Sequence, residues 1–259
     1  MPEIFYNSEM QSFVFSPLMG VIFAALFTGL TAKPSTQAPR TVVETRKIYI
    51  ERRYSHSKKS SNSDGNEVFA LGFLLLFVLW KYVQMAPIIH GYIETGLVTM
   101  LSFCLSGFVV STLRGQYTSH EWLQRILIPT FTLAACFPLF SMAKEAITPD
   151  LIELANNSNV IQFYTNDISE YGRYFLIFQV FGVCTLILLA TLSTFTFIHY
   201  LALMNQRENG ALHGFWVWCT SATSRLSGNG AYVLLIILLI TTIILLSGQA
   251  AEWITSIKV

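Results

Sequence analysis

Five histidines are the residues of this chain best suited to proton transfer, and two of them have an acidic residue at a useful spacing. His90 and Glu94 are four residues apart, so their side chains would share one face of a helix. His120 is followed directly by Glu121. General acid–base catalysis needs such groups within hydrogen-bonding reach of a substrate. These residues define one hypothesis, a small membrane enzyme, with His90 and Glu94 as its better pair.

No longer catalytic motif accompanies these pairs. The sequence contains no H-E-x-x-H, G-x-S-x-G or phosphate-binding loop pattern. His199 ends an apolar run and His213 lies among aromatic residues, positions typical of polar anchors at a membrane interface. The four cysteines lack metal-ligand spacing and are interpreted as small hydrophobic residues. We therefore expect a non-enzymatic protein with no catalytic residue, metal site or cofactor.

The composition indicates an integral membrane protein. Only 12% of the residues are charged and 53% are hydrophobic, whereas soluble domains carry roughly 25% charged residues. A charge at the bilayer centre costs on the order of 3 kcal/mol, so membrane-spanning segments lack charged residues. The predicted fold class is an all-α polytopic helical bundle.

Six apolar runs define the predicted membrane spans, with four spans as the fallback if the second or sixth run is peripheral. The runs cover residues 13–31, 68–80, 96–113, 126–143, 174–200 and 231–246. The second run is short, so we expect its helix to continue past Lys81 towards Ala86. Residues 87–95 are predicted to form a turn. Thr148, Pro149 and Asp150 suit the cap and first turn of a short helix.

Residues 33–67 form the only long basic segment. It holds eight of the sixteen lysines and arginines and four acids, which gives it a net charge of +4. Residues 41–54 are rich in β-branched and aromatic residues, so we expect short β structure there. Residues 55–66 are polar and low in complexity, which is typical of a flexible linker.

The distribution of charge predicts the topology. Cytoplasmic loops of membrane proteins are enriched in lysine and arginine, so the basic segment is expected in the cytoplasm and both termini outside. The predicted units are an outside N-terminus with the first span (1–31), the basic loop (32–67), spans two to four (68–143), an acidic outside loop (144–173) and the last two spans with an aromatic cytoplasmic connector (174–259). Short loops favour a bacterial inner (cell) membrane.

Two groups of residues are predicted to make contacts. The basic segment would bind a cytoplasmic protein, with nucleic acid the less favoured partner, through Arg46, Lys47, Ile48, Ile50, Arg52 and Arg53. Small residues one helical turn apart let helices approach closely, and these predicted helix-packing residues are Gly20, Ala24, Ser102 and Ser106. Such faces also lead us to expect a homo-oligomer in the lipid bilayer.

Three functions therefore compete. The favoured hypothesis is a non-enzymatic polytopic membrane subunit that self-associates and recruits a cytoplasmic protein through the basic loop. The first alternative is a homo-oligomeric pore or channel, acting as sensor or effector in a stress or defence system, whose lining would include Ser102, Ser106, Thr132 and Ser141. The second is the small membrane enzyme that would use the interfacial histidines and glutamates.

Overall fold

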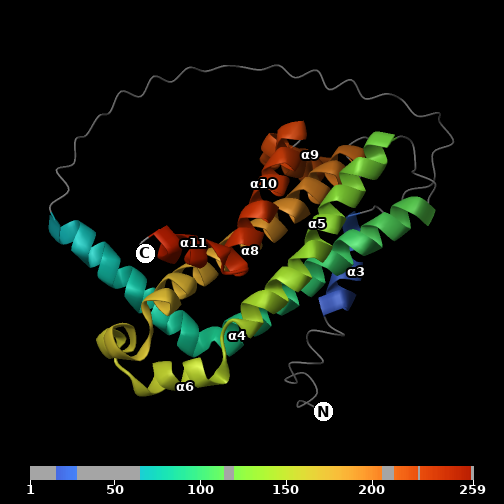
Figure 1. Cartoon of the computed structure of the whole chain (residues 1–259). Helices are drawn as coiled ribbons and strands as arrows, with labels where there is room; N and C mark the ends of the chain where they lie inside the picture. Colours follow the sequence, from blue (N-terminus) through green and yellow to red (C-terminus); the bar gives the residue numbers. More distant parts are fainter. Residues whose placement is uncertain (1–15, 28–64, 114–119, 206–212, 227, 258–259) are drawn as a thin grey trace, which may run out of the picture.

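The computed structural model describes residues 16–27, 65–113, 120–205, 213–226 and 228–257, and all regular structure in these ranges is helical. This confirms the all-α prediction for the described part of the chain (Figure 1). The principal helices are α3 (Ser16–Phe27), α4 (Gly65–Leu113), α5 (His120–Glu145), α6 (Pro149–Asn157), α8 (Glu170–Asn205), α9 (His213–Ala222), α10 (Asn229–Leu246) and α11 (Gln249–Ile257). Shorter turns are α7 (Val160–Gln162), the π-helix η2 (Phe163–Asp167) and the 3₁₀ turn η3 (Ser224–Leu226). Residues 41–54, where β structure is expected, lie outside the described residues.

Three of the described helices are long and apolar enough to cross a membrane. They are Gly72–Leu113 of α4, Gln124–Glu145 of α5 and Glu170–Leu203 of α8. Helices α10 and α11 add a fourth if the two, bent by 64° at their junction, are counted as one broken span. The membrane class is thus supported, with three or four candidate spans among the described residues where the sequence predicted six over the whole chain.

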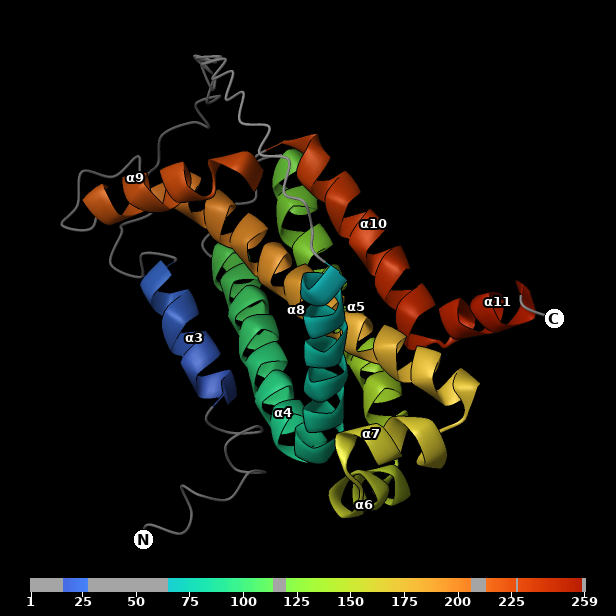
Figure 2. The same ribbon diagram turned by 90° about the vertical axis from the view of Figure 1, so that its left-hand side faces the viewer.

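The predicted turn at residues 87–95 is wrong. The second and third apolar runs belong to the single helix α4, which carries Pro87 in its interior. Proline removes one backbone donor and clashes with the preceding turn, so it kinks a helix more readily than it ends one when good helix formers lie on both sides. Figures 1 and 2 show the outcome: α4 bends sharply and its first half leaves the direction of the bundle.

The bundle is formed by the second half of α4 with α5, α8 and α10 (Figure 2). Helix α8 packs against α5 and α10. Leu133 of α5 and Leu186 and Leu189 of α8 have no exposed surface. Phe103 of α4 meets Phe197 of α8 edge to face, with ring centroids 5.4 Å apart. Apolar side chains therefore fill the centre of the described bundle.

The short helix α6 closes one end of the bundle, and its predicted start is confirmed. The Thr148 hydroxyl caps the helix by accepting from the Leu151 amide, and Pro149 occupies the first helical position. Trp80 Nε1 and Gln84 Nε2 of α4 both donate to the Ala155 carbonyl, at 2.9 and 2.8 Å. These two bonds fasten α6 to α4 just before the bend.

At the opposite end lies α9, within the connector predicted to be aromatic and interfacial (Figure 1). Trp216 is buried together with Cys219 and with Ala202 of α8. Trp218 is 65% exposed and stacks with Phe215. Trp216 therefore packs α9 against α8, whereas Phe215 and Trp218 face outward.

Candidate functional site

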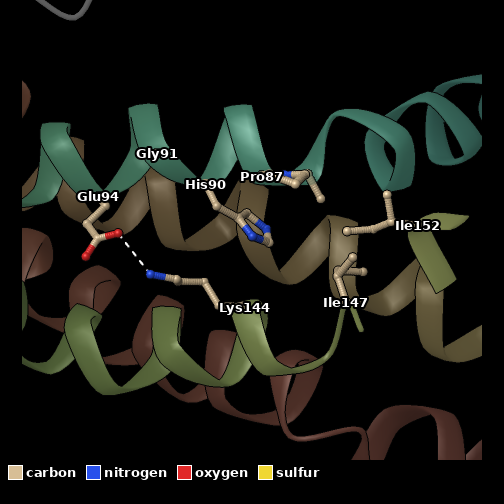
Figure 3. A pocket seen from close by; sticks show the side chains of 8 residues that line it. Pro87, His90, Gly91, Glu94, Lys144, Ile147 and Ile152 are labelled. Atoms are coloured by element: carbon tan, nitrogen blue, oxygen red, sulfur yellow. Dashed lines mark hydrogen bonds and ion pairs between the residues drawn. The ribbon is translucent and has the colours of Figure 1, made fainter. Parts of the chain in front are cut away.

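A pocket of about 300 Å³ lies where the bend of α4, the end of α5 and helix α6 meet. Figure 3 shows its lining side chains. The lining residues are Ala86, Pro87, His90, Gly91, Glu94, Lys144, Ile147 and Ile152. The pocket thus contains the pair that the sequence marked as its better candidate for acid–base chemistry, together with a lysine from another helix.

His90 is held in the pocket wall by two aromatic neighbours. Its Nε2 and the Tyr82 hydroxyl are 2.8 Å apart and share a hydrogen bond. Phe140 of α5 meets the imidazole edge to face at 5.6 Å. Only 6% of His90 is exposed. Because Tyr82 occupies one ring nitrogen, the other nitrogen, Nδ1, is the one available to a molecule in the pocket.

Glu94 and Lys144 form an ion pair across the pocket. The Lys144 Nζ donates to Glu94 Oε2 at 2.9 Å, and the lysine and glutamate side chains are 45% and 36% exposed. A half-exposed pair of this kind contributes roughly 0–1 kcal/mol to stability because water screens it. The pair therefore costs little to rearrange around a third charged group.

The polar and apolar groups occupy different ends of the pocket. In Figure 3, Glu94 and Lys144 lie at one end, Pro87, Ile147 and Ile152 lie at the other, and His90 lies between. No serine, threonine or cysteine is among the described residues that line the pocket. The arrangement suits recognition of an amphiphilic molecule, and the side chains in it that could act as nucleophiles are those of His90, Glu94 and Lys144.

The other predicted chemical residues lie away from this pocket. His120 begins α5 and His213 begins α9, at the end of the bundle opposite α6 (Figure 1). His199 is 2% exposed, and its Nδ1 is 2.8 Å from the Thr223 hydroxyl. Within the described residues, no three histidines, cysteines or acids are grouped closely enough to hold a metal ion. Of the described histidine side chains, that of His90 lines the pocket, and those of His199 and His213 do not.

Two further ionisable groups outside the spans keep their protons at neutral pH. Burial raises the pKa of Tyr164 in η2 and the pKa of the Cys219 thiol in α9. The four cysteines are all described, and all four are free thiols. Neither Tyr164 nor Cys219 is therefore an acid–base group near neutral pH.

Two of the predicted helix-packing residues, Gly20 of α3 and Ser102 of α4, meet within the same chain. Gly20 is buried, and a Cβ added there would lie 2.7 Å from the Ser102 Cβ and 2.8 Å from the Phe103 amide nitrogen. The two backbones therefore approach closely only because residue 20 lacks a side chain. Ser106 lies one turn beyond Ser102 and is half-buried, whereas the side chain of Ala24 is outside the described residues.

Charge separates the two ends of the described molecule. The α6 end carries Lys81, Lys144 and Arg173 with six acids, Glu94, Glu145, Asp150, Glu153, Asp167 and Glu170 (Figure 1). At the opposite end lie Glu121 and Arg125 near the start of α5 and Arg225 in η3. The partner-binding residues Arg46, Lys47, Ile48, Ile50, Arg52 and Arg53 fall outside the described residues.

Comparisons with known proteins yield no relative for this chain. No family model matches it, no curated protein matches it, and no solved structure matches it.

Proposed function

We propose that this chain is a non-enzymatic polytopic subunit of a bacterial cell membrane that recruits a cytoplasmic protein through residues 33–67. The observation that carries the proposal is the distribution of charge. Half of all lysines and arginines lie in that one segment. The other loops predicted on the same side add Arg114, Arg125, Arg207 and Arg225, whereas the segments predicted outside hold Lys144, Arg173 and Lys258. Since cytoplasmic loops are enriched in basic residues, the α6 end faces outside and the basic segment faces the cytoplasm.

The six-span topology is compatible with this proposal if α4 supplies two crossings. A helix of 49 residues is about 70 Å long. That is more than twice the ~30 Å hydrocarbon core of a bilayer. The bend lies at the acidic end, beside α6 (Figure 2). In the proposed arrangement the first half of α4 runs outward from the cytoplasm, the second half returns, and both termini of the chain lie outside.

Within the basic segment, residues 41–54 are proposed to dock as an extended strand on an exposed sheet edge of the partner. Backbone pairing would supply affinity, and Ile48 and Ile50 would fill alternate side-chain positions. Arg46, Lys47, Arg52 and Arg53 would steer the encounter in a salt-sensitive way. Residues 55–66 would serve as a flexible linker between this strand and the membrane.

Replacing Ile48 and Ile50 together with aspartate tests the docking. The prediction is that a partner co-purified in stoichiometric amount from mild detergent is lost, while membrane insertion is unchanged because the spans are untouched. The matched control replaces Arg46, Arg52 and Arg53 with glutamine, which should slow association and weaken its salt dependence. If the isoleucine variant retains its partner while the arginine variant inverts the topology, the segment is only a topological anchor.

The alternatives receive less support from the described residues. A pore through one chain would have to cross the apolar centre filled by Leu133, Leu186 and Leu189, so conduction would require several copies. An enzyme would have to work with His90, Glu94 and Lys144, the ionisable residues that line the pocket, and two of these are engaged with each other in an ion pair. The proposed self-association would use a surface that does not include Gly20, because Gly20 already packs against α4 of the same chain.

A further inference from the structure

We propose that the pocket between the bend of α4, the end of α5 and α6 binds a small amphiphilic zwitterion. The chemical class is a molecule that carries an ammonium and an acid group a few bonds apart and an apolar substituent. An α-amino acid with an aliphatic side chain is the simplest member. The inference stands on the pocket alone and does not depend on how residues 33–67 act.

The charge of the pocket selects a zwitterion. Lys144 and Glu94 already neutralise each other at 2.9 Å. An added anion or cation could bond to only one of these two residues and would compete with the ion pair for it. A zwitterion keeps the total at zero, because its acid group can accept from Lys144 while its ammonium donates to Glu94. Bonds of this kind are about twice as strong as neutral hydrogen bonds.

The shape of the pocket selects the apolar substituent. Its volume of about 300 Å³ is what about ten water molecules occupy in the liquid, and it lies at the lower end of the range for ligand pockets, about 300–1,000 Å³. The end away from the ion pair is lined by Pro87, Ile147 and Ile152 (Figure 3). An aliphatic side chain extending from the charged end would therefore contact these three residues and leave water.

His90 supplies a third polar contact between the two ends. It is 94% buried, since 6% of it is exposed, and its ring lines the pocket. Tyr82 holds Nε2 at 2.8 Å, so the imidazole is oriented before a ligand arrives. Nδ1 can then bond to the acid group or the ammonium of the ligand. Tyr82 acts here as a positioning residue.

Water-borne molecules can reach this site. Lys144 lies at the last turn of α5, whose candidate span ends at Glu145. Helix α6 lies beyond this span with Asp150 and Glu153 exposed and Ala155 buried. An amphipathic helix at the end of a span is typical of the level where membrane meets water. The pocket therefore opens near the interface, on the side proposed to face outside.

The experiment measures binding to the full chain in lipid nanodiscs by calorimetry. The probes are L-leucine, leucinamide without the acid group, 4-methylpentanoate without the ammonium, and glycine without the side chain. Leucine should bind about tenfold or more tightly than each of the other three, because every truncation removes one charge-assisted bond or the apolar contact. Equal binding of the four probes, or no binding of leucine, would overturn the proposal.

Substitutions of Glu94 and Lys144 test whether the ion pair binds the ligand. Glu94→Gln should erase the preference for leucine over 4-methylpentanoate, and Lys144→Met should erase the preference over leucinamide. Lys81→Met is the matched control, because Lys81 lies on α4 at the same end, donates to Gln84 and does not line the pocket. The charge swap Glu94→Lys with Lys144→Glu restores the pair and should recover binding above either single variant. Unchanged binding in both single variants would contradict the assignment.

A competition experiment then distinguishes two possible ligands with this chemistry, a lipid head group and a free zwitterion. Short-chain phosphatidylethanolamine carries an ammonium and a phosphate beside apolar chains, so it competes with leucine if a lipid head group is the natural occupant. Soluble glycerophosphoethanolamine lacks the chains. Displacement by the lipid alone assigns the site to the bilayer, and resistance to both assigns it to a free amphiphilic zwitterion. Displacement by phosphatidylglycerol to the same extent would show simple anion binding and overturn the proposal.

Discussion

At the scale of single residues, the most informative pair is Glu94 and Lys144. The residues are 50 positions apart in the sequence, where Lys144 marks the boundary between an apolar run and an acidic segment. The spacing of His90 and Glu94 predicts that they share a helix face, and the structure places both in the pocket. The lysine was missed because its place in the pocket is a tertiary contact, for which a single sequence carries no periodic signal.

Gly248 is the residue on which the junction of α10 and α11 depends. It has φ of +83°, and a Cβ added there would lie 3.1 Å from the Phe175 ring. Residues with a side chain pay roughly 1–2 kcal/mol for a left-handed conformation. Gly248→Ala should therefore lower the free energy of unfolding by about 1–2 kcal/mol, measured by thermal or denaturant unfolding in detergent.

Gly230→Ala provides the matched control for that change. Gly230 lies in the first turn of α10, and a Cβ there meets nothing within 4 Å. The alanine should leave stability unchanged or raise it by up to about 1 kcal/mol through helix propensity. Equal destabilisation by both variants would show that the backbone at 248 is not constrained as described.

At the scale of elements, the capping residues predicted where α6 begins, whereas the apolar periodicity did not predict that α4 continues through Pro87. The start of α6 was predictable because Thr148 and Pro149 act through local geometry. The continuity of α4 was not, because Pro87 ends a helix in one context and bends it in another. The bend is supported from outside the helix: Trp80 and Gln84, just before Pro87, both bond to the Ala155 carbonyl of α6. Such support is invisible in the sequence of α4 itself.

The contact between α3 and α4 gives an element-scale prediction. Gly20→Ala should separate the two helices, because the new Cβ would lie within 3 Å of Ser102, Phe103 and Thr99, partly against backbone. We expect a lower thermal unfolding temperature in detergent, with a loss of about 1–3 kcal/mol typical of overpacking. The mass by light scattering should stay the same, because the contact lies within one chain.

Gly96→Ala is the control for this substitution. Gly96 is also in α4, and a Cβ there would meet nothing within 4 Å. It should be neutral or mildly stabilising. A change in oligomer mass with Gly20→Ala, at unchanged stability, would instead place Gly20 at a contact between copies.

At the scale of the whole molecule, the two ends differ in charge and the middle is apolar. Six acids and the candidate pocket lie at the α6 end together with Lys81, Lys144 and Arg173, and Arg125 and Arg225 lie at the other. The core between them is mostly apolar, with leucine, isoleucine, valine and aromatic side chains beside a few buried polar ones such as Gln179 and Thr242. The composition predicted this class because a bilayer excludes charge from the spans. It did not predict the pocket, which depends on how three separate elements meet.

The basic segment and the acidic α6 end are proposed to lie on opposite sides of the membrane, with the basic segment in the cytoplasm. Single cysteines at Ser60 and Asn156, placed in a chain whose four native cysteines are replaced, test it in intact cells. An impermeant maleimide should label Asn156→Cys, which is exposed in α6, and should label Ser60→Cys only after the cells are opened. Labelling of Ser60→Cys in intact cells while Asn156→Cys is protected would contradict the topology and, with it, recruitment of a cytoplasmic partner by residues 33–67.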